Sequence, residues 1–216
     1  MNTRQAVRVA CVALAIGAPT PALAQRATRA CTRPDTTAEW FRQQRRWLSE
    51  EKHDWSDDAF RNELLSAAGL MAKPLAAQLG AQRLYEPSIA LSDTVVLARL
   101  RTLAGTRGSA WPTRSVVGAA GVRAVWVLAQ RDTALQRVAL HRMMESGPDE
   151  ALPADVAVLE DRVRLQSGRK QLYGSQLRMI DGSIPMPMPI EDSAHVDMRR
   201  DAAGLPPLLQ AMCSLR

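Results

Sequence analysis

The sequence predicts a mainly α-helical protein, a single helical domain with one small β-hairpin near the C-terminus. Apolar residues recur at helical spacing through most of the chain, and a strand-like pattern with an Asp181-Gly182 turn signal occurs only late in it. The chain has 216 residues, of which 46% are hydrophobic and 23% charged. This length suits one domain, and the apolar fraction is that of a globular protein, which excludes wholesale disorder.

The first 24 residues are typical of a secretory signal peptide. Arg4 and Arg8 form a basic segment, residues 9–18 are almost wholly apolar, and Ala22-Leu23-Ala24 offers small residues for cleavage. We therefore expect cleavage before Gln25 and a periplasmic or secreted protein. The apolar run is too short for a membrane anchor, so we expect no transmembrane segment after cleavage.

The basic charge of the chain is weak evidence for a nucleic-acid partner. Its formal charge is +6, and removing a leader with two arginines and no acid leaves 26 basic and 22 acidic residues, or +4. The basic residues are mostly arginines scattered along the chain, whereas nucleic-acid-binding proteins usually concentrate them on one face. We therefore expect no nucleic-acid partner.

Signal cleavage would leave two cysteines, Cys31 and Cys213, in a compartment where disulfides persist. Two cysteines allow one intramolecular pair, so we expect a Cys31–Cys213 bond that joins the ends of the mature chain. Loop-closure models give such a bond about 4–5 kcal/mol. Two free thiols are the alternative, because pairing does not follow from sequence alone.

Residues 25–91 are predicted to form an N-terminal helical segment. Thr36 and Glu39 have capping-box spacing, and an apolar stripe containing Trp40 and Trp47 follows, which we interpret as buried core rather than a ligand platform. A second helical pattern opens at Ser56. Its expected inward positions are Phe60, Leu64 and Ala67 or Ala68.

A motif-bearing helical domain with the hairpin is expected over residues 92–214. Its first helix runs from Ser92 through Leu103, and the second, from Val116 to Gln130, is apolar almost all round and therefore central. Thr133 and Gln136, again at capping-box spacing, open a third helix that Gly147-Pro148 closes. Pro153 suits the first turn of a fourth helix, which ends near Gly168.

The pattern then changes to a strand from Gln171 to Ile180, with Tyr173, Leu177 and Met179 on one face. The return limb has proline at 185, 187 and 189, so it must be an edge strand or a polyproline-like stretch. Asp192 or Ser193 caps a short last helix through Arg200, which Gly204 and two prolines stop.

These segments carry short motifs that resemble, in order and spacing, a bacterial domain-of-unknown-function family. The motifs are Trp111-Pro112-Thr113, Leu135-Gln136, Asp161-Arg162-Val163, Gln171-x-Tyr173-Gly174-Ser175-Gln176, Pro189-Ile190-Glu191-Asp192, Val196-Asp197-x-Arg199-Arg200 and Gly204-Leu205-Pro206-Pro207-Leu208. The resemblance covers roughly residues 92–211 and implies no established activity. The sequence departs from the family pattern at two places. Residues 129–133 lack a histidine that members usually carry, and Ser175 replaces threonine.

The motif residues form the candidate ligand-binding site. They are Asp161, Arg162, Gln171, Tyr173, Gly174, Gln176, Asp192, Asp197, Arg199 and Arg200. Two interpretations stay open: a structural network, in which carboxylate, amide and arginine groups satisfy one another, and a functional pocket. If the motif residues form a functional pocket, we expect a non-enzymatic domain that binds a protein partner or a small polar ligand through the hairpin edge.

The alternative is a hydrolase-like enzyme that uses Asp161, Glu191 or Asp192 with His195, which requires these groups to converge on one cleft. The sequence contains no Gly-x-Ser-x-Gly elbow, phosphate loop or dinucleotide fingerprint. His141 and Glu145 share a helix face, but two ligands do not make a zinc site. We therefore expect neither a metal nor another cofactor.

Overall fold

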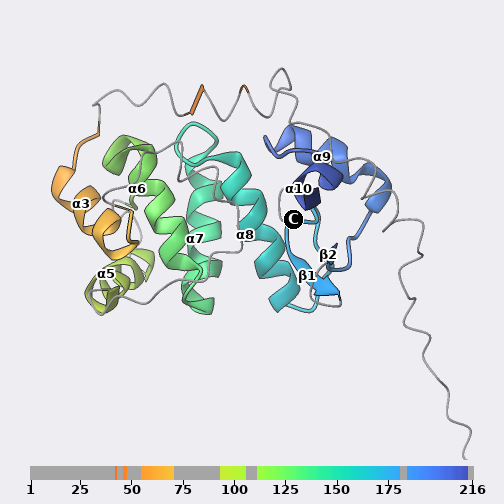
Figure 1. Cartoon of the computed structure of the whole chain (residues 1–216). Helices are drawn as coiled ribbons and strands as arrows, with labels where there is room; N and C mark the ends of the chain where they lie inside the picture. Colours follow the sequence, from red (N-terminus) through yellow and green to blue (C-terminus); the bar gives the residue numbers. More distant parts are fainter. Residues whose placement is uncertain are drawn as a thin grey trace, which may run out of the picture.

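The computed structural model describes residues 42, 46–47, 55–70, 93–105, 111–180 and 184–213. Within them the chain is mainly helical, with one two-stranded antiparallel sheet near the C-terminus. The helices between residues 58 and 166 follow one another across the molecule, and the hairpin and the short helices after it gather at the opposite end from the first of them (Figure 1). The predicted fold class is therefore confirmed.

Helix α3 spans Asp58–Ala67 and α5 spans Asp93–Gly105. The N-cap of α3 is Asp57, whose carboxylate accepts a hydrogen bond from the Phe60 amide at 2.8 Å, so the helix starts one residue later than a cap at Ser56 would place it. Phe60, Leu64 and Ala67 are buried, as their spacing predicts.

Helix α6, Arg114–Ala129, is the central helix, and every residue from Val117 to Ala129 is buried. Gly118 interrupts it with a φ of 68°, a left-handed conformation that glycine adopts without steric cost. A Cβ at this position would lie 2.8 Å from a ring carbon of Trp55, so the missing side chain also lets the segment before α3 pack closely on α6.

Helices α7, Thr133–Ser146, and α8, Pro153–Gln166, complete the stack. The expected capping box at Thr133 and Gln136 is wrong, because Asp132 is the N-cap of α7 and accepts from the amides of Ala134 and Leu135 at 2.8 and 2.9 Å. The Gln136 side chain instead donates to the Gln130 carbonyl at 3.0 Å. Pro153 occupies the first turn of α8 as predicted.

The hairpin consists of β1, Leu177–Ile180, and β2, Ile184–Pro187. The prediction of a strand starting at Gln171 is wrong for residues 171–176, where only a single parallel bridge joins Gln171 to Ile190. The amides of this stretch bond to a side chain on α8 rather than to a neighbouring strand. The predicted Asp181-Gly182 turn lies outside the described residues.

The proline-rich limb forms the edge strand that its composition predicts. Leu177 pairs with Pro187 and Met179 with Pro185, while the Met188 amide donates to the Gln176 carbonyl at 2.9 Å. Because amides alternate in direction along a strand, the proline nitrogens face away from β1. That outer edge has no N–H groups at these positions to offer another strand.

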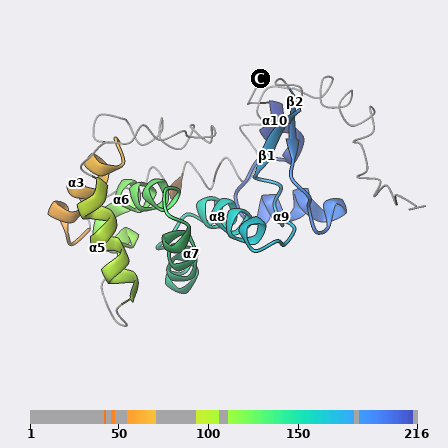
Figure 2. The same cartoon turned by 90° about the horizontal axis from the view of Figure 1, so that it is seen from below.

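The C-terminal part contains a short 3-10 turn at Ser193–His195, helix α9 at Val196–Ala202 and helix α10 at Leu208–Cys213. The short helix after Asp192 is confirmed, whereas α10 was not predicted, because it follows two prolines and is too short to show a period. Seen from below, the hairpin and α10 project together to one side of the helical row (Figure 2).

Buried apolar side chains form two clusters. The larger lies among α3, α5, α6, α7 and α8, and the smaller contains Trp47, Leu152, Ala157, Ala203 and Leu205, with Tyr173 packed against it. Trp47 is buried, as expected of the apolar stripe, but most of that stripe, its capping box, the signal peptide and Cys31 lie outside the described residues. None of the helices in the described ranges combines the length and apolarity needed to cross a membrane.

Candidate functional site

Asp161 on α8 organises the motif segment. Its side chain is fully buried, and its carboxylate accepts hydrogen bonds from the amides of Leu172 at 2.6 Å, Tyr173 at 3.0 Å and Ser175 at 2.9 Å. Gly174 turns the chain with a φ of 65°, which brings these amides around one carboxylate. A Cβ on Gly174 would lie 2.9 Å from Cδ1 of Ile190, so the position also requires the smallest residue.

Gln171 joins the loop formed by residues 172–176 to the chain that follows the hairpin. Its buried side-chain nitrogen donates to the carbonyls of Gln176 at 3.1 Å and Met188 at 2.6 Å, and its oxygen accepts from the Gln176 amide at 3.0 Å. Its backbone amide also bonds to the Pro189 carbonyl at 3.0 Å. All polar groups of this glutamine side chain therefore serve the local fold.

Three motif arginines attach the same loop to its neighbours. Arg162 donates to the Gln176 side-chain oxygen at 3.1 Å, Arg199 to the Leu172 carbonyl at 2.9 Å and Arg200 to the Tyr173 carbonyl at 2.6 Å. Burial lowers the pKa of Arg200 to about 10, which leaves it charged at neutral pH. The Asp197 carboxylate accepts from the Leu208 amide at 2.7 Å, at the start of α10.

The structure thus brings most of the predicted site residues together, but it uses many of them to hold the loop rather than to line a hollow. Asp161 and Gln171 are enclosed, and Asp197 supports α10. The hydrogen bonds of these residues form a structural network, which was one of the two interpretations of the motif residues. Tyr173 and Arg199 are the two of the predicted residues that also line the groove described below.

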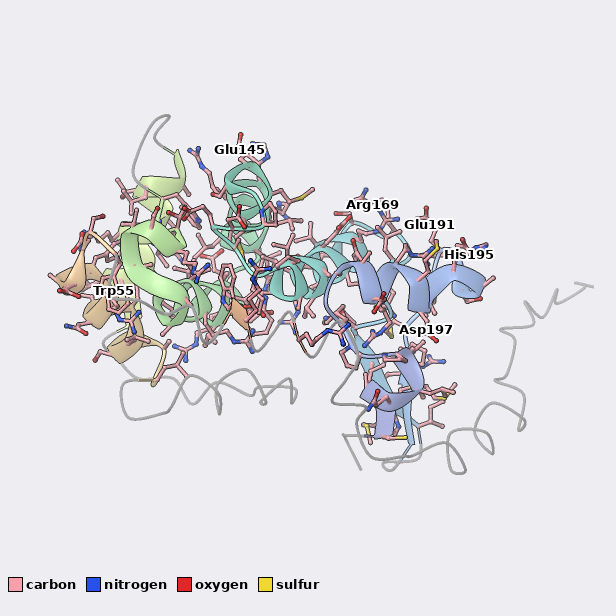
Figure 3. All side chains as sticks on the ribbon, turned by 90° about the horizontal axis from the view of Figure 1, so that it is seen from above. Trp55, Glu145, Arg169, Glu191, His195 and Asp197 are labelled. Carbon is pink, nitrogen blue, oxygen red and sulfur yellow. The ribbon has the colours of Figure 1, made fainter. Side chains whose placement is uncertain are left out.

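The residues of the hydrolase alternative do not converge on one cleft. Asp192 and His195 form an exposed pair with 2.8 Å between carboxylate oxygen and Nδ1, and this hydrogen bond lowers the pKa of Asp192. Glu191 pairs with Arg164, whereas Asp161 is buried beneath the loop. Glu191 and His195 lie on the outside of the molecule (Figure 3). This arrangement gives the hydrolase alternative no support.

A groove of about 380 Å³ lies between α7, α8 and α9, and we call it the α7–α9 groove. Its lining is mainly apolar and includes Met143, Met144, Pro148, Pro153, Val156, Ala157, Tyr173, Arg199 and Ala202. A second hollow of about 360 Å³ shares Pro148, Pro153, Ala202 and Ala203 with it and is lined by Arg46 and Arg114 as well. The two hollows therefore adjoin along α9.

Tyr173 gives the groove a neutral hydrogen-bond donor. Burial, with a further contribution from the negative charges of Glu160 and Asp161, raises the pKa of its phenol. Burial also raises the pKa of Glu160, a half-buried residue on α8 that sequence reasoning missed. Helical spacing alone assigns Glu160 to a solvated face, because nothing in the sequence indicates that Tyr173 folds back over α8.

The apolar groove residues were also missed as site residues. Gly147-Pro148 was expected to close a helix, and α7 does end at Ser146, while Met143 is a buried residue of that helix. Their juxtaposition with Tyr173 and Arg199 arises from tertiary packing. Among the residues with described positions, no group of three or more His, Cys, Asp or Glu is placed to hold a metal ion.

Comparison with known proteins gives one match. The model of a family of unknown function, DUF6624, matches residues 82–215, which is more than half of the chain. No curated protein and no solved structure matches the sequence or the fold.

Proposed function

Since the chain belongs to the family of unknown function DUF6624, which supplies no activity, we propose from its own geometry that it is a non-enzymatic binding domain. The proposed binding surface is the α7–α9 groove. The observation that carries this proposal is that Tyr173 and Arg199, both from the motifs, meet an apolar lining in one hollow of about 380 Å³. Small-molecule sites are typically concave, largely apolar and of about 300–1,000 Å³.

The groove favours a ligand with an apolar body and a hydrogen-bond acceptor. Met143, Met144 and the prolines offer apolar contact, and methionine adapts to varied shapes. Tyr173 donates a neutral O–H group. Arg199 uses three of its five N–H groups on Leu172 and Asp192, which leaves donors for an acceptor on the ligand.

This site differs from the hairpin edge expected from the sequence. The prolines of β2 remove the amides that an added strand would bond to, so β2 is a poor template for an extended partner. The lining also favours a partly apolar ligand over the purely polar one that the motif composition suggested.

The groove is tested with 1-anilinonaphthalene-8-sulfonate, a fluorescent probe that combines an apolar ring system with an anionic group. We expect saturable binding by the folded protein, and about tenfold weaker binding by Ala202→Trp, because the indole would fill the hollow. Tyr173→Phe removes only the hydroxyl group and tests whether that group contributes to binding of the probe. Ala134→Trp is the matched control, since Ala134 is an exposed α7 residue that is not part of the groove lining. Equal binding by both tryptophan variants would contradict the proposal.

We also propose that the protein is exported and that the mature chain carries the Cys31–Cys213 bond. Mass spectrometry of protein expressed with its native N-terminus in a bacterium should find a chain that begins at Gln25. Without reduction, both cysteines should resist alkylation, and a Cys31→Ser variant should expose one reactive thiol. An uncleaved chain would contradict export, and two freely alkylated thiols in the native mature protein would contradict the bond.

A further inference from the structure

A third hollow lies among α6, α8, α9, α10 and the chain from Gly174 to Leu177. It is a small cavity of about 70 Å³ whose lining includes Arg123, Trp126, Asp155, Ser175, Arg200 and Leu205. None of these residues lines the α7–α9 groove. We call it the arginine cavity, and it is independent of the proposed binding function.

Arg200 lines this cavity and has unused hydrogen-bond donors. The residue is only 2% exposed, and it donates from Nε to the Pro206 carbonyl at 2.5 Å and from one terminal nitrogen to the Tyr173 carbonyl at 2.6 Å. A guanidinium has five N–H groups, so two such bonds leave three. None of the three has an acceptor among the described protein groups.

The cavity has an excess of positive charge. Arg123 forms a buried ion pair with Asp155, so these two charges offset each other. Arg200 has no carboxylate within 4.0 Å in the described part of the chain, although Asp197 and Asp161 attract it from farther away. A buried charge of this kind is strongly unfavourable unless it is paired or solvated.

We propose that the arginine cavity binds one small, singly charged oxyanion of the size of formate. The planar guanidinium of Arg200 matches the two oxygens of such an anion. Ser175 supplies a further donor, because its hydroxyl oxygen accepts from the Gln176 side-chain nitrogen at 3.1 Å and its own hydrogen remains available. Leu205 and Trp126 contribute to the apolar part of the lining, and the volume of about 70 Å³ limits the ligand to a few heavy atoms.

The test uses sodium formate and sodium benzoate as probes on the full mature chain, with ionic strength held constant by a bulky sulfonate buffer salt. Thermal unfolding is followed as the concentration of each probe rises, because a ligand that binds only the folded state raises the melting temperature saturably. Formate should give a saturable rise, whereas benzoate, too large for about 70 Å³, should behave as the buffer salt.

Three variants, one of them a control, locate the formate-binding site. Ser175→Ala should bind formate about tenfold more weakly, since one hydrogen bond to a charged group is lost. Ser193→Ala, an exposed serine that does not line the cavity, is its matched control and should behave as the wild type. Arg200→Lys should abolish saturable binding, and if this variant fails to fold, the comparison of the two serine variants decides.

Three results would overturn the proposal. If formate shifts the melting temperature no more than the buffer salt does, the cavity holds water alone. If benzoate stabilises as well as formate, the size limit is wrong and the anion site is part of a larger one. If Ser175→Ala and Ser193→Ala bind formate equally, formate binds elsewhere on the protein.

Discussion

Replacement of Asp161 by alanine is expected to lower the free energy of unfolding by about 3–5 kcal/mol. The variant leaves the amides of Leu172, Tyr173 and Ser175 without their common acceptor at a fully buried position. Unpaired buried donors each cost about 1–3 kcal/mol, which water entering the space left by the carboxylate would partly offset. Equilibrium unfolding in urea measures the change.

Two further variants separate the hydrogen bonds from general effects of substitution on α8. Asp161→Asn keeps one oxygen acceptor and should be destabilised less than Asp161→Ala. Glu160→Ala is the matched control, because Glu160 is the preceding residue, is half-buried and makes no side-chain hydrogen bond in the described structure. A loss below about 1 kcal/mol in Asp161→Ala would show that the amides find other acceptors and that Asp161 does not organise the loop.

The second large effect on the free energy of unfolding is expected at the buried ion pair between Arg123 on α6 and Asp155 on α8. Asp155→Leu should lower the free energy of unfolding by about 3–5 kcal/mol, because Arg123 then keeps its charge in the interior with no partner. Both side chains are 5% exposed, and burial raises the pKa of Asp155 against the opposing effect of Arg123. Urea unfolding again provides the measurement.

The double variant Arg123→Met/Asp155→Leu should recover most of that loss, since apolar side chains of similar volume avoid the desolvation of both charges. The exposed pair of Arg99 and Glu63 is the control, and Glu63→Leu should change the free energy of unfolding by less than about 1 kcal/mol. A double variant as unstable as the single one would show that packing, rather than the orphaned charge, causes the loss.

Helix positions followed from local pattern because each signal acts over a few residues. Pro153 marked the start of α8, Gly147 the end of α7, and the continuous apolar run of α6 its central place. The predictions from the sequence were wrong where a residue distant in sequence forms the hydrogen bonds that a local pattern assigns to a neighbouring segment. Residues 171–176 have strand-like composition, yet Asp161 accepts their amides and prevents sheet pairing.

The candidate site was predicted only in part for the same reason. Motif spacing identified Asp161, Gln171, Tyr173 and Arg199, but whether each is enclosed or lines a hollow depends on the packing of α8 and α9 against the loop. Glu160, Met144 and Ala202 carry no signal of their own, because their role depends on neighbours distant in sequence.

The sequence by itself determined the helical class, the single hairpin, its proline-blocked edge and the segment in which polar motif residues gather. Periodicity, turn residues and the missing proline amide act locally, so they are readable without a structure. The tertiary structure alone decided that Asp161 is enclosed, that Tyr173 and Arg199 meet an apolar groove, and that Arg200 lines a cavity together with the Arg123–Asp155 pair. Burial and charge pairing are set by residues that only folding brings together, and these two properties distinguish a structural carboxylate from a binding residue.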